Sequence, residues 1–263
     1  YLVMVSYKGI YMRKKRVAVT LMQTMLIVGI VFLVLFMILA VPMYNSYKQK
    51  KAVITYRTLY STLQQANRMY SLVNSMNMND YDTTLPVEKF AETYFTPYLS
   101  INNYCKESQE QCWKTPQYKD LKNTRMYDKS KYSIILADKT VLGFFKNKNG
   151  LISLIVDIDG PVGVNRLGRD VFVFYFYNNR QRPKLCPEKV YNEHYIADGM
   201  HLGGYDKCGI PHDIYTLTDF YQNKFEDGCS KKSKSTDDGV GLGAACGALI
   251  SKSGWVIDKS YPW

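Results

Sequence analysis

The fold is decided by residues 13–51, which read RKKRVAVTLMQTMLIVGIVFLVLFMILAVPMYNSYKQKK. Four basic residues precede residues 17–47, which carry no charged side chain, and three lysines follow at 48, 50 and 51. About twenty apolar residues are enough to cross the hydrocarbon core of a bilayer as a helix. Backbone groups in lipid must bond within the helix, so we expect it to be continuous past Gly29 and to run to Pro42 near its outer end. The sequence therefore predicts one transmembrane helix over residues 19–44.

The six cysteines indicate where the rest of the chain lies. All of them follow the apolar segment, and no two form a CxxC pair, which is typical of disulfides in an oxidising compartment. Basic residues flank both ends of the segment, so charge alone orients it weakly. We expect a single-pass protein of the cytoplasmic (inner) membrane with an extracytoplasmic C-terminal domain. Nearness in sequence favours three pairs, although six cysteines allow many others: Cys105–Cys112, Cys186–Cys208 and Cys229–Cys246.

A cleaved secretory signal peptide is the alternative for the same opening. Its apolar region would be about 7–15 residues long and would end in small residues of the A-x-A type. The apolar run here is longer, and nothing like A-x-A follows Pro42. An uncleaved anchor is therefore the better interpretation.

The helix is expected to continue beyond the membrane. Apolar residues recur every three or four positions through residues 45–75, the spacing that places them on one face of a helix: Val53, Tyr56, Tyr60, Leu63, Ala66 and Tyr70. We expect this amphipathic continuation to pack on a sheet formed by the remaining chain.

Residues 76–263 have the pattern of one globular domain. Pro86 can begin a helix with an apolar stripe through Phe90 and Tyr94. Residues 132–137 and 141–145 predict a hairpin, and the β-branched and aromatic runs 151–156 and 171–177 predict two more strands. The expected fold class is α+β: a long N-terminal transmembrane helix packed on an antiparallel β-sheet, with a loop-rich, disulfide-bonded C-terminal region from residue 178 to 243.

The opening resembles that of type IV pilins and type II secretion pseudopilins. In that prepilin-type family a short basic leader precedes Phe-Thr-Leu-x-Glu and an apolar helix that ends near a proline; Thr20, Leu21 and Pro42 match. Ala18 stands where the leader usually ends in Gly, Val19 replaces Phe, and Gln23 replaces Glu. The resemblance implies a leader over residues 1–18, cleavage by a prepilin peptidase between Ala18 and Val19, methylation of the new N-terminus, and assembly through Thr20, Leu21, Gln23 and Pro42. The neutral Gln23 pairs with a positive N-terminus more weakly than a carboxylate would.

The far end of the chain is similar to one group of bacterial prepilin-type proteins. The matching residues are Val156-Asp157-Ile158-Asp159-Gly160-Pro161, Cys246-Gly247-Ala248-Leu249-Ile250, Gly254-Trp255 and Tyr261-Pro262-Trp263. The fold implied is pilin-like. The function implied is that of a structural subunit, including a minor or tip subunit, of a type IV pilus or type II secretion pseudopilus. The partners implied are other pilins or pseudopilins, the prepilin peptidase and the inner membrane. Besides the inner membrane, the protein would then also be located in a surface filament.

One constellation of oxygen-bearing side chains could hold a cation: Asp157, Asp159, Asn165 and Asp170. Calcium takes about six to eight oxygen ligands, and closely spaced Asp and Asn residues can supply several. The alternative is an Asx-rich turn in which an aspartate caps backbone N–H groups and Gly160 adopts a positive φ. The spacing does not follow an EF-hand. Calcium is the one cofactor that the sequence suggests.

The sequence carries only weak signals for an enzyme, and we expect no catalytic activity. His194, His201 and His212 could ligate zinc with Cys208, but their spacing fits no common site, and loop positions are expected for His201 and His212. A net charge of +11 and the run Lys231, Lys232 and Lys234 suggest nucleic acid as another partner. The alternative function is therefore a membrane-anchored extracytoplasmic binding protein, either an adhesin or a DNA-capturing minor pilin.

Overall fold

The computed structural model describes most of the 263 residues. The described residues are 2–105, 112–113, 118–124, 126, 130, 132–147, 150–182, 184–193, 195–221, 228–230, 232, 241–259 and 261–263, with side chains from residue 20 onward except that of Tyr221. The chain divides into two compact units, Tyr1–Lys48 and Gln49–Trp263. Each unit is described by itself.

The first unit consists of the first part of helix α1 (Leu2–Asn74), which contains Pro42 in its interior. Its large apolar side chains are exposed, from 45% for Val34 to 74% for Met22. α1 is long and apolar enough to cross a membrane. An all-round apolar surface without a protein partner is stable in lipid and unfavourable in water. These properties are consistent with the membrane anchor predicted from the sequence.

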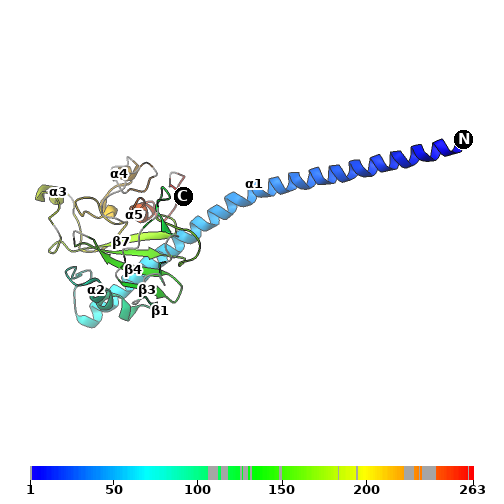
Figure 1. Ribbon diagram of the computed structural model, residues 1–263. Coiled ribbons are helices and arrows are strands. Elements are labelled where there is room, and N and C mark those ends of the chain that lie inside the picture. Colours follow the sequence, from blue (N-terminus) through cyan, green and yellow to red (C-terminus); the bar gives the residue numbers. More distant parts are fainter. Residues whose placement is uncertain are drawn as a thin grey trace. The chain divides into compact units, whose positions relative to one another are not determined.

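The second unit is built on a six-stranded antiparallel sheet (Figure 1). The strand order is β1-β3-β4-β5-β7-β8. The strands are β1 (Ile101–Tyr104), β3 (Tyr132–Leu136), β4 (Val141–Lys146), β5 (Ile152–Asp157), β7 (Val171–Tyr177) and β8 (Gly199–Leu202). Val156 of β5 lies opposite Leu142 of β4 and Phe172 of β7. These central strands are rich in β-branched and aromatic residues and are buried on both faces. The predicted hairpin and the two further strands are confirmed.

The second part of α1, drawn in cyan in Figure 1, packs on this sheet through the predicted stripe. Tyr56 and Leu63 are fully buried, and the Tyr56 ring stacks on Phe172 of β7 with centroids 4.0 Å apart. Tyr60 stacks on Phe174 of the same strand at 6.2 Å. Aromatic pairs of this kind add to the free energy of apolar burial. The sequence pattern therefore identified the packing face of the helix correctly.

A second helix, α2 (Val87–Tyr94), covers the same face of the sheet near its end. Pro86 precedes its first turn. Proline is tolerated there because a backbone N–H at the start of a helix has no hydrogen-bond partner within the helix. Phe90 packs edge-on against Phe176 of β7 at 4.8 Å. A short 3-10 helix, η1 (Thr96–Tyr98), follows. The predicted helix is confirmed.

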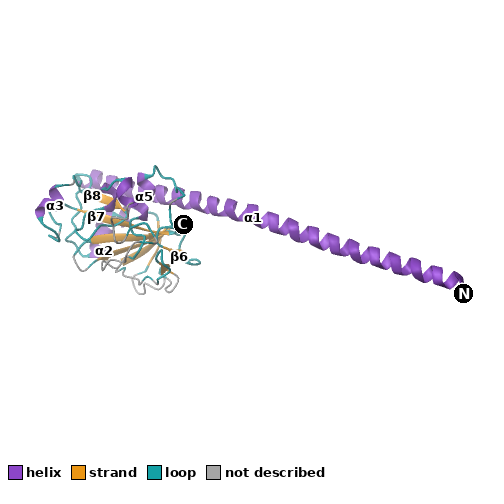
Figure 2. Ribbon diagram, turned by 90° about the horizontal axis from the view of Figure 1, so that it is seen from above, coloured by secondary structure: helices purple, strands orange, loops and turns teal. Residues whose placement is uncertain are grey.

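The C-terminal region is more ordered than the sequence suggests. It contains α3 (Glu188–Asn192), η3 (His212–Ile214), α4 (Leu217–Tyr221) and α5 (Cys246–Lys252), of which Figure 2 labels α3 and α5, in purple around the strands. The region 178–243 is expected to be loop-rich, and the sequence does not indicate the strand β8 within it, which pairs with β7 at the edge of the sheet. These elements are too short to show a periodic pattern.

Three disulfides fasten this domain, and they are the pairs favoured by nearness in sequence: Cys105–Cys112, Cys186–Cys208 and Cys229–Cys246. The last one ties the first residue of α5 to Cys229. Loop closure in the unfolded chain makes each bridge worth about 2–4 kcal/mol in the chain-entropy account.

α5 approaches α1 closely at one glycine. A Cβ atom at Gly247 would overlap the hydroxyl group of Tyr56. That hydroxyl group is buried and has no hydrogen-bond partner among the described residues. The absence of a side chain at position 247 therefore lets the two helices meet over the sheet.

Candidate functional site

The residues predicted to direct processing and assembly lie in the first part of α1. Ala18 and Val19 precede the residues whose side chains are described. Thr20, Leu21 and Gln23 are exposed, so Gln23 is a polar side chain on an apolar surface. The structure therefore places these residues on one helix.

The predicted cation constellation forms a turn centred on Asp157, the last residue of β5. The Asp157 Oδ1 atom accepts hydrogen bonds from the backbone N–H of Gly160 at 3.1 Å and of Asp159 at 3.4 Å. Gly160 has a φ of +82°, a conformation that glycine adopts without strain. Capping by an aspartate and a positive φ at Gly160 are the two properties that the turn interpretation predicted.

The second carboxylate oxygen of Asp157 is held by a pair of short strands. Tyr118 of β2 (Tyr118–Lys119) donates its hydroxyl group to Oδ2 at 2.5 Å, and Asn165 of β6 (Asn165–Arg166) donates its amide at 2.6 Å. β2 and β6 form a separate parallel pair. Asp170 takes part through its backbone carbonyl, which accepts from the Ile158 N–H at 2.9 Å.

Burial raises the pKa of Asp157 and so favours its neutral, protonated form. Asp157 is fully buried, and burial together with the negative charge of Asp159 raises its pKa to about 8, against the opposing hydrogen bond from Tyr118. A protonated carboxyl group is a poor calcium ligand, because cation binding requires it to lose the proton. Within the described ranges, no three His, Cys, Asp or Glu side chains are grouped to hold a metal ion. The geometry favours a structural turn.

A chelator test separates the two interpretations. We expect excess EGTA to leave the melting temperature of the full chain unchanged, because the donors around Asp157 belong to the protein itself. Thermal unfolding followed by tryptophan fluorescence, with EGTA or with added calcium, would measure this. A melting temperature that rises with calcium and falls again in Asp159→Ala would instead establish the cation site.

His201 and His212 serve the architecture of the domain. His201 lies in β8, where Nδ1 is 2.8 Å from Asp213 Oδ1 and Nε2 is 2.8 Å from the carbonyl of Ala197. Burial lowers the pKa of His201, but the bonds and charge of Asp213 outweigh it and the pKa is raised. His212 is fully buried in η3. The loop positions expected for both are wrong, His194 lies outside the described residues, and Cys208 is in a disulfide.

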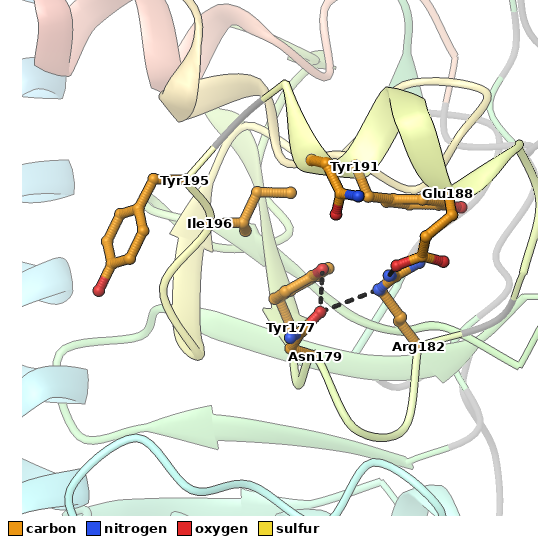
Figure 3. A pocket seen from close by; sticks show the side chains of 8 residues that line it. Tyr177, Asn179, Arg182, Glu188, Tyr191, Tyr195 and Ile196 are labelled. Carbon is orange, nitrogen blue, oxygen red and sulfur yellow. Dashed lines mark hydrogen bonds and ion pairs between the residues drawn. The ribbon is translucent and has the colours of Figure 1, made fainter.

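A pocket of about 390 Å³ opens beyond the end of β7 (Figure 3). Arg182 lines it and is held by three neighbours: the guanidinium stacks on the Tyr191 ring at 3.7 Å, Nη2 lies 2.6 Å from Glu188 Oε1, and Nε donates to Asn179 Oδ1 at 2.9 Å. Burial raises the pKa of Tyr177 to about 12, so its hydroxyl group keeps its proton and also donates to Asn179 Oδ1.

Tyr195 and Ile196 complete the lining; in Figure 3 Ile196 lies between Tyr195 and the cluster around Arg182, and the Tyr195 ring points away from that cluster. Tyr195 is 94% exposed, which is unusual for a large aromatic side chain.

The disulfide between Cys186 and Cys208 supports the Tyr191 side of the pocket. The Tyr191 hydroxyl group donates to the carbonyl of Cys208 at 2.8 Å and accepts from the N–H groups of Leu185 and Cys186, each at 3.2 Å. The wall that carries Arg182 is thus fixed to the bridge by three hydrogen bonds.

Sequence reasoning missed this pocket. Its residues are scattered between 177 and 196 without a motif spacing. The available signal was local composition, because Tyr, Asn and Arg residues gather around Cys186.

Comparisons of the chain with protein-family profiles, with curated proteins and with solved structures found no significant match.

Proposed function

We propose that this protein is a pilin-like structural subunit, of the minor or tip kind, in a type IV pilus or type II secretion pseudopilus. The observation that carries the proposal is α1. Its first part is apolar and exposed, and its second part packs a stripe on an antiparallel sheet in a disulfide-bonded domain. The resemblance of residues 19–30 to the prepilin-type opening supports the same assignment. No catalytic role is part of the proposal.

The assembly mechanism follows from the physics of the apolar segment. In the membrane, lipid covers its side chains; in a filament, the equivalent helices of neighbouring subunits would cover them, so little apolar surface would meet water during transfer. Among the described residues, nothing lies within 4 Å of a Cβ position at Gly29, which leaves room there for a neighbouring helix. Lys48, whose ammonium group lies 4.8 Å from the Tyr44 ring centre, suits the headgroup region.

Gln23 favours a minor or tip position within this proposal. A buried glutamate in one subunit would offset the positive N-terminus of another, and a neutral amide does so only weakly. A subunit placed at the end of a filament needs fewer such pairs. Replacing Gln23 by Glu should therefore increase incorporation along the filament.

Processing provides the test. The full chain, produced beside an active prepilin peptidase, is expected to yield a new N-terminus at Val19, which N-terminal sequencing and intact mass would detect. Ala18→Gly restores the usual leader ending and should be cleaved at least as completely, while Ala18→Leu and an inactive peptidase serve as controls. Intact leaders on both the wild type and the Ala18→Gly variant would contradict the processed-subunit proposal.

The second candidate function is a membrane-anchored extracytoplasmic binding protein. The pocket beside Cys186–Cys208 favours it, since it presents several polar side chains and one exposed tyrosine. For capture of DNA, Lys232 is exposed, but Lys231 and Lys234 lie outside the described residues. Intact leaders combined with ligand binding would favour this candidate.

A further inference from the structure

We propose that a doubly protonated His201 holds the edge strand β8 in place, and that β8 loosens when this imidazole ring loses one proton. The inference concerns the disulfide-bonded domain and does not depend on filament assembly. It rests on the hydrogen-bond partners of the two ring nitrogens, on the charges around the ring, and on the backbone segments that the ring connects.

Both ring nitrogens of His201 face hydrogen-bond acceptors. Nδ1 lies 2.8 Å from Asp213 Oδ1, and Nε2 lies 2.8 Å from the carbonyl oxygen of Ala197. A backbone carbonyl oxygen can only accept, and a neutral imidazole has a single N–H group to donate. A neutral ring would therefore direct a lone pair at one of the two oxygen atoms, whereas a doubly protonated ring satisfies both contacts.

Asp213 is the acceptor in its contact with Nδ1. Its second oxygen, Oδ2, accepts the backbone N–H of Leu202 at 2.8 Å, so both carboxylate oxygens face donors. Of the two groups that share the proton, the imidazole has the higher ordinary pKa, about 6.5 against about 3.9 for an aspartate. The proton between them therefore resides on Nδ1, and the contact is an ion pair.

The nearest groups around His201 are acidic or neutral. Asp213 approaches from η3, and Asp198 adds a second negative charge from the turn before β8. From β7, Tyr177 meets the ring edge-on at 6.1 Å, and Tyr175 lies opposite His201 in the strand register. Burial raises the pKa of both tyrosines, that of Tyr177 to about 12, so both phenol groups stay neutral.

The other elements that pack nearby do not oppose a positive ring. Asp213 also faces Tyr56 and Tyr60 of α1, whose pKa values are raised by burial, so these phenols are neutral as well. The remaining groups are His212, which bonds through Nδ1 to the carbonyl of Gly203, the exposed Lys252 of α5, and Arg182, which is paired with Glu188. Burial lowers the pKa of His201, but the hydrogen bond and charge of Asp213 outweigh burial and raise it.

The charged ring connects three backbone segments. Ala197 precedes β8, Leu202 is its last residue, and Asp213 belongs to η3. β8 has one strand neighbour in the sheet, β7, so contacts outside the sheet contribute much of what holds it. When one proton leaves, one of the two ring contacts becomes a repulsion between a lone pair and an oxygen atom. The segments on that side of the ring then separate.

The direction of the pH effect follows from the raised pKa. The stabilisation is complete below about pH 6.5, the ordinary pKa of histidine, and is lost as pH rises through the pKa of His201 in the folded domain. An alkaline medium therefore loosens β8 and frees the edge of β7, which is a template for pairing with another strand.

Long-range proton–nitrogen NMR measures the protonation state directly. The full chain, labelled with 15N-histidine, is placed in phosphatidylcholine nanodiscs, and His201 is assigned by the signal that disappears in His201→Gln. Both ring nitrogens are expected to be protonated at about pH 6.5, with a titration midpoint above that value. A midpoint at or below about 6.5, or a neutral ring throughout, overturns the proposal.

Hydrogen exchange measures the loosening. After correction for the intrinsic pH dependence of exchange, residues 197–202 should exchange about 10–100-fold faster one pH unit above the His201 midpoint than one unit below it. This is the usual worth of one charge-assisted hydrogen bond. Residues 132–136 of β3 are the internal control and should not change. An equal acceleration in both segments, or none in residues 197–202, overturns the proposal.

Asp213→Asn is the matched variant. The asparagine oxygen can still accept the Leu202 N–H, and its amide can donate to Nδ1, so a neutral His201 would have both contacts satisfied. The His201 midpoint should fall below that of the wild type, and the pH-dependent exchange of residues 197–202 should disappear. Asp198→Asn, which removes a charge but no ring contact, should keep the pH-dependent exchange. An unchanged midpoint in Asp213→Asn, or pH-dependent exchange that persists in it, overturns the role of the ion pair.

Discussion

Between pH 4 and pH 8 the free energy of unfolding is expected to fall with rising pH, by up to about 1.4 kcal/mol per pH unit, because of Asp157. Its pKa is raised from 3.8 to about 8 by burial and by Asp159. In this range the unfolded chain has lost the proton and the folded chain keeps it. The stabilisation from the bound proton is therefore complete below pH 4 and is lost as pH approaches 8.

Urea unfolding at several pH values would measure this dependence. All three tryptophans lie in the Gln49–Trp263 unit, so their fluorescence reports on that unit within the full chain. Asp157→Asn cannot titrate, and the difference between wild type and this variant separates Asp157 from the other carboxyl groups. A difference that stays constant with pH, or one that increasingly favours the wild type as pH rises, would show that the pKa of Asp157 is not raised.

The substitution Gly247→Ala is expected to lower the free energy of unfolding by about 1–3 kcal/mol, although alanine is the better helix former. The new methyl group would overlap the Tyr56 hydroxyl group, and the Tyr56 ring cannot move aside because it stacks on Phe172 at 4.0 Å. Urea unfolding gives the value, and Trp255, whose ring lies 5.8 Å from that of Tyr56, is a nearby reporter.

Tyr56→Phe supplies the matched background for this prediction. Removing a buried hydroxyl group that has no partner among the described residues should raise stability by about 1 kcal/mol on its own. In that background Gly247→Ala should cost clearly less, because the overlapping oxygen is gone and only the ring carbon remains close. The same cost in both backgrounds would refute steric contact between the two residues as the cause.

The elements with a repeating pattern could be predicted, and the short ones could not. Periodicity identified the packed part of α1, and β-branched runs identified β5 and β7, because these elements are long and bury a regular face. β8 reads Gly-Met-His-Leu, and nothing local in it indicates a strand. It forms because β7 offers a free edge and because Asp213 accepts the N–H of Leu202. Such a cause is tertiary and leaves no periodic pattern in the sequence.

The candidate sites show the same limit. The turn at Asp157 was predictable, since an aspartate three residues before a glycine caps its own turn. The partner Tyr118, 39 residues earlier, was not, because β2 meets Asp157 only in the folded domain. The pocket was missed for a related reason: Arg182, Glu188 and Tyr191 become one site through stacking and ion pairing.

The close fit of α5 over α1 has a consequence for biosynthesis. Tyr56 is made early, whereas its partners Phe172 and Gly247 are made late. At about 5–20 residues per second, a ribosome needs on the order of 10–40 s to pass from Tyr56 to Gly247. Until β7 has been made, the aromatic stripe of the nascent chain has no cover, and this part of α1 is then expected to be the main target of chaperones and proteases. A chain that ends before α5 would still lack the cover that Gly247 provides over Tyr56.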